Sequence, residues 1–76
     1  MTLLPATLDL RGEACPMTFV RTELALEGLS PGAVLEVILD AGEPAESVPR
    51  SVALRGNEIL DATPAGAAVR VRIRKR

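Results

Sequence analysis

The chain has 76 residues, a net charge of −1 and a single cysteine, and it contains no histidine. A chain of this length forms one domain with a small core, so residues 1–76 are predicted to be a single domain. One cysteine excludes an internal disulfide, and the lack of histidine excludes Ser-His-Asp and Cys-His catalytic sites and leaves a zinc site without its commonest ligand.

The first half of the chain predicts a strand, a helix and a second strand. Apolar and polar residues alternate from Ala6 to Leu10, which is typical of a half-buried strand. A helix is predicted to begin at Cys15-Pro16, since proline is favoured in the first helical position, and to run to about Glu27. Its predicted apolar stripe contains Phe19, Val20, Leu24 and Leu26. The alternating segment Val34 to Leu39 predicts the next strand.

The second half of the chain predicts short helical segments and two strands. Pro44 to Arg55 is interpreted as one helical turn, a break before Pro49 and a second short helix that ends at Gly56. Glu58 to Ala62 is predicted to be a short strand, followed by a turn over residues 63–66. The clearest strand pattern is Ala67 to Arg74, where the apolar and the basic residues take opposite faces. The apolar face contains Val69, Val71 and Ile73, and the basic face contains Arg70, Arg72 and Arg74.

These elements predict an α/β (α+β) fold with two layers. A strand, helix and strand at the start make the first two strands parallel, with a right-handed crossover. The alternating strand patterns bury one face of the sheet and leave the other in water, so both helices are expected on the same face.

Cys15 is the candidate functional residue, because it is predicted to occupy the N-cap of the first helix. The first N–H groups of a helix lack partners within it, and the helix dipole places about half a positive charge there. We therefore expect the sulfur of Cys15 to accept hydrogen bonds from the N–H groups of Met17 and Thr18, which favours the thiolate. The same setting suits a persulfide, which is more acidic than a thiol.

Charged neighbours bear on the same thiol. Arg11 and Arg21 lie near Cys15 in sequence and would favour the thiolate, whereas Glu13 would oppose it. The competing interpretation is that Cys15 is a small buried apolar residue. Its place before Pro16 argues for reactivity, because Ser, Thr, Asp or Asn would cap the helix better if capping were the only need.

The segment Leu8-Asp9-Leu10-Arg11-Gly12-Glu13-Ala14-Cys15-Pro16 resembles the signature of the TusA/SirA-like sulfur carriers. The likeness continues through Val20-Arg21, Pro31-Gly32, Leu35-Glu36-Val37 and Val48-Pro49. It implies a βαβαββ sandwich with a mixed four-stranded sheet and a persulfide site at Cys15. It also implies no cofactor other than covalently held sulfur, a cysteine desulfurase or rhodanese as donor, and an acceptor protein in tRNA thiolation, molybdenum cofactor metabolism or sulfur oxidation.

The chain departs from the usual pattern of these carriers at two places. Thr18 stands where the Cys-Pro-x-Pro motif has its second proline, so it keeps a backbone N–H and adds a hydroxyl group. Asn57 stands where a histidine often follows the second helix. The first departure bears on the partner and the pathway, since the nucleophile itself is present.

Two other functions stay open at this point. In the first, the protein is a regulatory or protein-binding module and Cys15 only caps a helix. In the second, Cys15 is a thiol redox sensor, which would need a thiol from a partner. We expect a shuttle rather than a stand-alone enzyme, because the chain offers no histidine as general base.

The basic segment Arg70 to Arg76 is interpreted as a solvated sheet face whose arginines pair with Glu36 and Asp40. The alternative is docking of residues 74–76 on an acidic protein. Direct nucleic-acid binding is not expected, since Phe19 is the only aromatic side chain available for stacking.

The sequence contains no apolar run near the roughly 20 residues that span a membrane, and no segment with the features of a secretory leader. With one cysteine, this predicts a reducing compartment, the cytoplasm, and no membrane contact.

Overall fold

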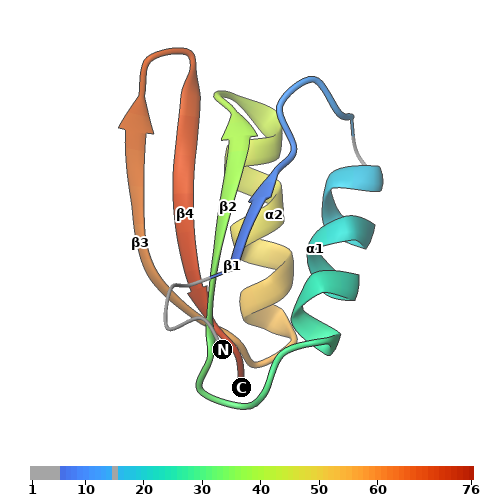
Figure 1. Ribbon diagram of the computed structural model, residues 1–76. Coiled ribbons are helices and arrows are strands. Elements are labelled where there is room, and N and C mark those ends of the chain that lie inside the picture. Colours follow the sequence, from blue (N-terminus) through green and yellow to red (C-terminus); the bar gives the residue numbers. More distant parts are fainter. Residues whose placement is uncertain (1–5, 15) are drawn as a thin grey trace.

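The computed structural model describes residues 6–14 and 16–76 (Figure 1). Its elements are β1 (Ala6–Asp9), α1 (Met17–Glu27), β2 (Val34–Asp40), α2 (Glu43–Leu54), β3 (Glu58–Ala65) and β4 (Ala68–Arg74). The predicted order of strands and helices is confirmed.

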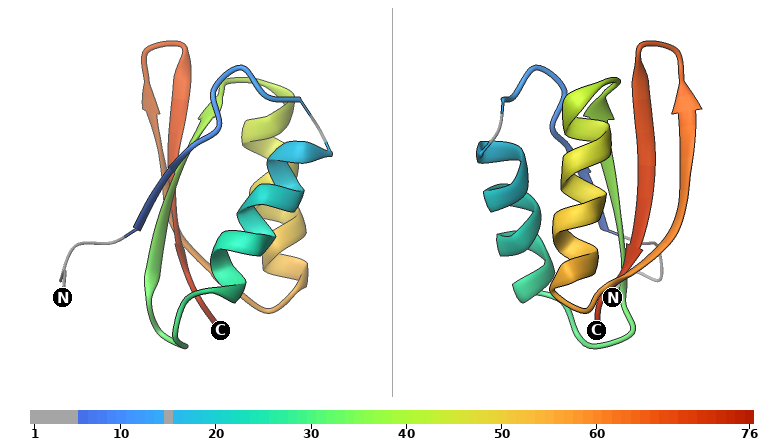
Figure 2. Two further views of the ribbon diagram at one scale, coloured as in Figure 1. Left: turned by 45° about the vertical axis from the view of Figure 1, so that its right-hand side comes forward. Right: turned by 180° about the vertical axis from the view of Figure 1, so that it is seen from behind.

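The four strands form one mixed sheet in the order β1-β2-β4-β3. Strand β1 runs parallel to β2, and β4 runs antiparallel to both of its neighbours. Both helices cover the same face of this sheet, and the other face is open (Figures 1 and 2). The predicted two-layer sandwich with parallel first strands is therefore confirmed.

The β1–α1 loop and the β2–α2 connection lie at the same end of the molecule. Strands β1 and β2 end there and helices α1 and α2 begin there, at the top of Figure 1. The β1–α1 loop consequently lies beside the connection from β2 to α2. Cys15 lies outside the described residues, and the loop 10–14 that leads to it belongs to this end.

The core lies between the sheet and the helices and is built from aliphatic side chains. Full burial of one such side chain contributes about 1.5–3 kcal/mol to the stability of the folded state, relative to leaving it exposed to water. The alternation predicted for β2 and the apolar face predicted for β4 are confirmed, since every second residue of β2 is buried and so are Val71 and Ile73 of β4. The buried cluster contains Leu10, Leu26, Leu35, Val37, Leu39, Val48, Val52, Val71 and Ile73.

The predicted apolar stripe of α1 is confirmed for Leu26, which is buried, and for Phe19, which packs against the core, and it is wrong for Val20 and Leu24. The face of α1 that is turned to the core carries Thr18, Thr22 and Leu26, which are spaced by four residues. The hydroxyl of Thr22 donates to the carbonyl of Thr18 at 2.7 Å, so burial leaves this polar group paired. Val20 and Leu24, by contrast, are 38% and 62% exposed.

The predicted break before Pro49 is also wrong, because α2 is one continuous helix with Pro49 inside it. Proline lacks the N–H that would donate to the carbonyl four residues earlier, so the helix forgoes one hydrogen bond. Val48 and Val52 are both buried against the sheet, and this burial on either side of Pro49 favours a single helix.

Strand β3 is longer than predicted and continues through Pro64 to Ala65. The turn therefore falls on residues 66–67, where Gly66 adopts a φ of 67°. Proline is tolerated here because β3 is an edge strand, where a missing N–H leaves no neighbouring strand unpaired.

Candidate functional site

The loop that leads to Cys15 is held by the end of β2. The N–H of Gly12 donates to the carboxylate of Asp40 at 2.8 Å. The N–H of Leu10 donates to the carbonyl of Ile38, also at 2.8 Å. Gly12 has a φ of 83°, a left-handed conformation that L side chains rarely adopt, so glycine is needed for this turn.

The same loop is tied to β1 by Arg11. The guanidinium of Arg11 donates to both carboxylate oxygens of Asp9, at 3.0 and 2.7 Å, and the Arg11 N–H donates to Asp9 at 3.1 Å. These hydrogen bonds lower the pKa of Asp9 to about 2. Arg11 therefore faces Asp9 in the structure, and its expected effect on Cys15 stays a prediction.

A second ion pair ties the loop to α1. Arg21, in the second turn of the helix, pairs with Glu13 in the loop. The sequence predicted opposite effects of these two residues on Cys15. In the structure each charge faces the other, so their influence at a distance largely cancels.

Helix α1 begins later than predicted. Its first helical residue is Met17, and Pro16 takes the position before it, with φ −89° and ψ 2°. The N–H groups of Met17 and Thr18 donate to the carbonyl of Ala14, at 2.9 and 3.3 Å. Both groups thus have a backbone acceptor, and their expected hydrogen bonds to the sulfur of Cys15 stay a prediction, because Cys15 lies outside the described residues.

The remaining site predictions divide between surface and core. Pro16 and Met17 are exposed, and the support that they were expected to give Cys15 stays a prediction. Thr18 is completely buried. Thr18 therefore adds nothing to the exposed surface, and its expected contact with the sulfur of Cys15 stays a prediction.

An exposed apolar surface on α1 was missed by the sequence reasoning. Met17, Val20 and Leu24 are 50%, 38% and 62% exposed and follow one another at spacings of three and four residues. Such residues share one face of a helix. We call Met17, Val20 and Leu24 the α1 stripe. One sequence signal could have indicated this surface. Thr18, Thr22 and Leu26 recur every four residues and so form a second regular face of the helix, and if that face is buried, the α1 stripe lies on the surface.

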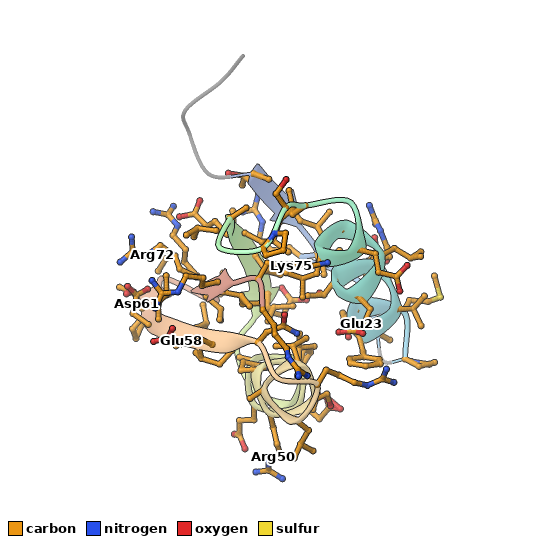
Figure 3. The ribbon with its side chains drawn as sticks, turned by 90° about the horizontal axis from the view of Figure 1, so that it is seen from below. Glu23, Arg50, Glu58, Asp61, Arg72 and Lys75 are labelled. Atoms are coloured by element: carbon orange, nitrogen blue, oxygen red, sulfur yellow. The ribbon has the colours of Figure 1, made fainter. Side chains whose placement is uncertain are left out.

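The arginines of β4 lie on the open face of the sheet and pair with carboxylates on both sides. Arg70 pairs with Glu36 at 3.5 Å, as predicted. Arg72 pairs with Asp61 of the edge strand β3, and Figure 3 shows this pair on the side away from the helices. The predicted pairing with Asp40 is wrong for the residues that the structure describes, because Asp40 stands opposite Ala68 in the ladder and its carboxylate is turned to the N–H of Gly12.

The basic end of the chain is bound to its own domain. The ammonium group of Lys75 donates to the carbonyl of Leu26 at 2.7 Å, near the end of α1. The N–H of Arg76 donates to the side-chain oxygen of Asn57 at 3.1 Å. The side chain of Asn57 also donates to Val52 at 3.0 Å, so it caps α2. Docking of residues 74–76 on an acidic protein stays a prediction.

Residues 6–75 match the profile of the sulfurtransferase TusA family. The chain belongs to the TusA family. Relatives within it are named candidate sulfur carrier proteins. The one from Archaeoglobus fulgidus is 46% identical over 59 residues, which cover 78% of this chain and 67% of that protein. The one from Thermotoga maritima is 42% identical over 60 residues, covering 79% and 76%.

Two further comparisons extend over more of this TusA family chain. The candidate sulfur carrier protein YedF of Escherichia coli is 34% identical over 68 residues, covering 90% of this chain and 88% of YedF. The crystal structure of a SirA-like protein from Desulfitobacterium hafniense superposes with a TM-score of 0.78 at 22% identity, covering 91% and 95%. This likeness shows the fold, and the predicted TusA/SirA-like resemblance is confirmed.

Neither α1 nor α2 has the length and apolar character that a membrane-crossing helix requires, in the part of the chain that the structure describes.

Proposed function

We propose that this TusA family member is a sulfur carrier that binds sulfane sulfur as a persulfide on Cys15 and passes it to an acceptor protein. The observation that carries the proposal is that Cys15 is the only thiol in the chain. A member of this family therefore has one side chain on which to hold sulfur covalently. Cys15 precedes Met17, the first residue of α1, by two positions, and the positive end of a helix dipole favours thiolate and persulfide anions.

The chemistry is an exchange between sulfur atoms. The thiolate of Cys15 attacks the outer sulfur of a persulfide on the donor protein and forms a new S–S bond. The S–S bond of the donor breaks, and the inner sulfur of the donor leaves as a thiolate with the bonding electron pair. In the second step an acceptor thiolate attacks the outer sulfur on Cys15 in the same way. The sulfane sulfur keeps its oxidation state, so the exchange consumes no oxidant, reductant or cofactor.

The donor in this proposal is a cysteine desulfurase or a rhodanese, and the acceptor decides the pathway. Transfer to proteins of tRNA thiolation, cofactor biosynthesis or sulfur metabolism uses the same step. We place the reaction in the cytoplasm, because a reducing compartment keeps the thiol of a single cysteine free.

The α1 stripe supports direct transfer between proteins. Two sulfur atoms exchange only in contact, so each partner must cover the surface around Cys15. The stripe starts at Met17 and leads along α1 through Val20 to Leu24, with all three side chains exposed. Exposed apolar side chains that lie together commonly mark protein interfaces. We assign the α1 stripe to contact with an apolar surface beside the persulfide of the partner.

The test is intact-protein mass spectrometry after incubation with a cysteine desulfurase and cysteine, or with a rhodanese and thiosulfate. The wild-type protein should gain the mass of one sulfur atom, and a reducing agent should remove it. Cys15→Ser and Cys15→Ala should gain nothing. If the wild-type protein stays unloaded with both donors although Cys15 is alkylated readily, the carrier proposal is wrong.

The same preparations separate the other two functions. A protein-binding module would keep its cellular activity in the Cys15→Ser variant. A redox sensor would gain oxygen from dilute peroxide, or form a mixed disulfide, faster than it gains sulfur.

A further inference from the structure

We propose that Asp40, the last residue of β2, is a positioning residue for sulfur transfer. Its carboxylate accepts the N–H of Gly12 and so holds the loop that leads to Cys15. This inference deepens the proposed function and rests on it.

The hydrogen bond joins two parts of the chain that are far apart in sequence. Gly12 and Asp40 are 28 residues apart, and the N–H of Gly12 lies 2.8 Å from the carboxylate. Gly12 precedes Cys15 by three residues. A shift of the peptide at Gly12 is therefore passed along a very short segment to the nucleophile.

The bond is also of a strong kind. Hydrogen bonds to an ionised carboxylate are about twice as strong as those between neutral groups. The turn at Gly12 has a left-handed φ of 83°, which presents its N–H to the end of β2. No heavy atom outside its immediate chain neighbours lies within 4 Å of where a β-carbon at Gly12 would stand, so backbone conformation is what requires glycine here.

Strand β2 does not need this carboxylate for its own pairing. Asp40 stands opposite Ala68 of β4 in the ladder, and the next N–H, of Ala41, donates to the carbonyl of Ala67 at 3.0 Å. On the other side, Leu10 donates to Ile38 through the backbone. The side chain of Asp40 can therefore be changed with the sheet intact, and the expected loss is in the placement of the loop.

Rates of group transfer respond steeply to placement. A displacement of about 1 Å at a reacting centre can cost about 100-fold in rate. We therefore expect Asp40→Ala to load sulfur about 10- to 100-fold more slowly than the wild-type protein. Asp40→Asn keeps an acceptor oxygen and removes the charge, so it should restore most of the rate. Asp61→Ala is the matched control, because Asp61 is a strand carboxylate that pairs with Arg72 on the open face.

Three measurements are made on each variant. Quenched mass spectrometry follows loading from a cysteine desulfurase, hydrogen exchange by NMR follows the Gly12 amide, and iodoacetamide alkylation follows Cys15 without any partner. Asp40→Ala should lose protection at Gly12, keep protection at Val37 in the middle of β2, and change the alkylation rate. Asp61→Ala should match the wild-type protein in all three, and Asp40→Asn should lie much closer to the wild-type protein than to Asp40→Ala.

Several results would overturn the inference. It fails if Asp40→Ala loads sulfur at the wild-type rate. It also fails if Asp40→Asn loads as slowly as Asp40→Ala, because the slow loading would then come from the lost charge and not from the lost hydrogen bond. Should Asp40→Ala not fold, Asp40→Glu displaces the carboxylate by one methylene group, and loading at the wild-type rate would count against the inference. Failure of the wild-type protein to load refutes the carrier proposal instead, whereas an unchanged Gly12 amide and alkylation rate in Asp40→Ala refutes the role of Asp40.

Discussion

Glu13 and Arg21 form an ion pair that joins the loop before Cys15 to the second turn of α1. Their side chains are 30% and 41% exposed, so the pair contributes little to the free energy of unfolding. Its main effect is that a negative charge two residues before Cys15 and a positive charge six residues after it neutralise each other.

This pair predicts opposite effects of two substitutions on the Cys15 thiol. Glu13→Gln leaves the guanidinium of Arg21 without its counter-charge and should lower the pKa of the thiol. Arg21→Gln leaves the Glu13 carboxylate and should raise it. The double variant should return close to the wild-type value. The measurement is the pH dependence of the iodoacetamide alkylation rate, and single variants that shift it in the same direction would contradict the prediction.

The α1 stripe predicts that Leu24 matters to the partner and not to the fold. Truncation of an interface residue that anchors binding costs about 1 kcal/mol or more, so Leu24→Ala should raise the KM for the donor protein about fivefold if Leu24 is such an anchor. The unfolding free energy should stay within about 0.5 kcal/mol of the wild-type value, since Leu24 is 62% exposed. Leu54→Ala is the control, because Leu54 is 83% exposed on α2. Equal effects of the two substitutions on KM would argue against docking at the stripe.

The Asp9–Arg11 pair predicts a loss of stability in acid. The pKa of Asp9 falls from 3.8 to about 2 through its hydrogen bonds with Arg11. A carboxyl with a lowered pKa in the folded state stabilises the protein above its unfolded pKa, and this stabilisation is lost as the pH falls from about 4 to about 2. Asp9→Asn should therefore unfold more easily than the wild-type protein in urea at pH 5, with the difference shrinking at pH 2. A difference that is the same at both pH values would contradict this.

Pro49 predicts a stabilising substitution. Pro49→Ala restores an N–H that donates to the carbonyl of Ala45 within α2, and proline inside a helix costs about 3 kcal/mol relative to alanine. Part of this gain is offset, because alanine frees the unfolded chain, so we expect about 1–2 kcal/mol in urea unfolding. Pro44→Ala is the control, since Pro44 lies in the first turn of α2, where no helical N–H bond is lost. Equal stability of the two variants would refute the explanation.

The parts of the fold that the sequence predicted are those with a local signal. The alternation along β4 defined both its faces, and the order of elements led to the parallel pair and the two layers. The core face of α1 had no such signal in hydrophobicity alone, because two of its buried residues are the threonines Thr18 and Thr22, and the hydroxyl of Thr22 donates to the carbonyl of Thr18. The break at Pro49 was a local rule that burial of Val48 and Val52 overrode.

The site was predictable in outline and not in its contacts. The motif around Cys15 pointed to the TusA family, which the comparison confirms. The contact between Gly12 and Asp40 joins segments on two different strands, so no pattern within either segment indicates it. It follows from topology, because the carboxyl ends of parallel β1 and β2 meet at one end of the sheet. The Ala14 carbonyl that accepts the N–H groups of Met17 and Thr18 was not predicted either, since a side-chain motif does not indicate a backbone acceptor.

The parallel course of α1 and α2 has an effect that no single side chain provides. Both helices start at the end of the molecule that carries the loop to Cys15 (Figure 1). Their peptide dipoles therefore add, and the partial positive charges of two helix starts face the same direction. On the proposed function, an anionic sulfur that approaches this end meets the positive ends of both helix dipoles, which belong to the backbone and do not depend on any one surface side chain.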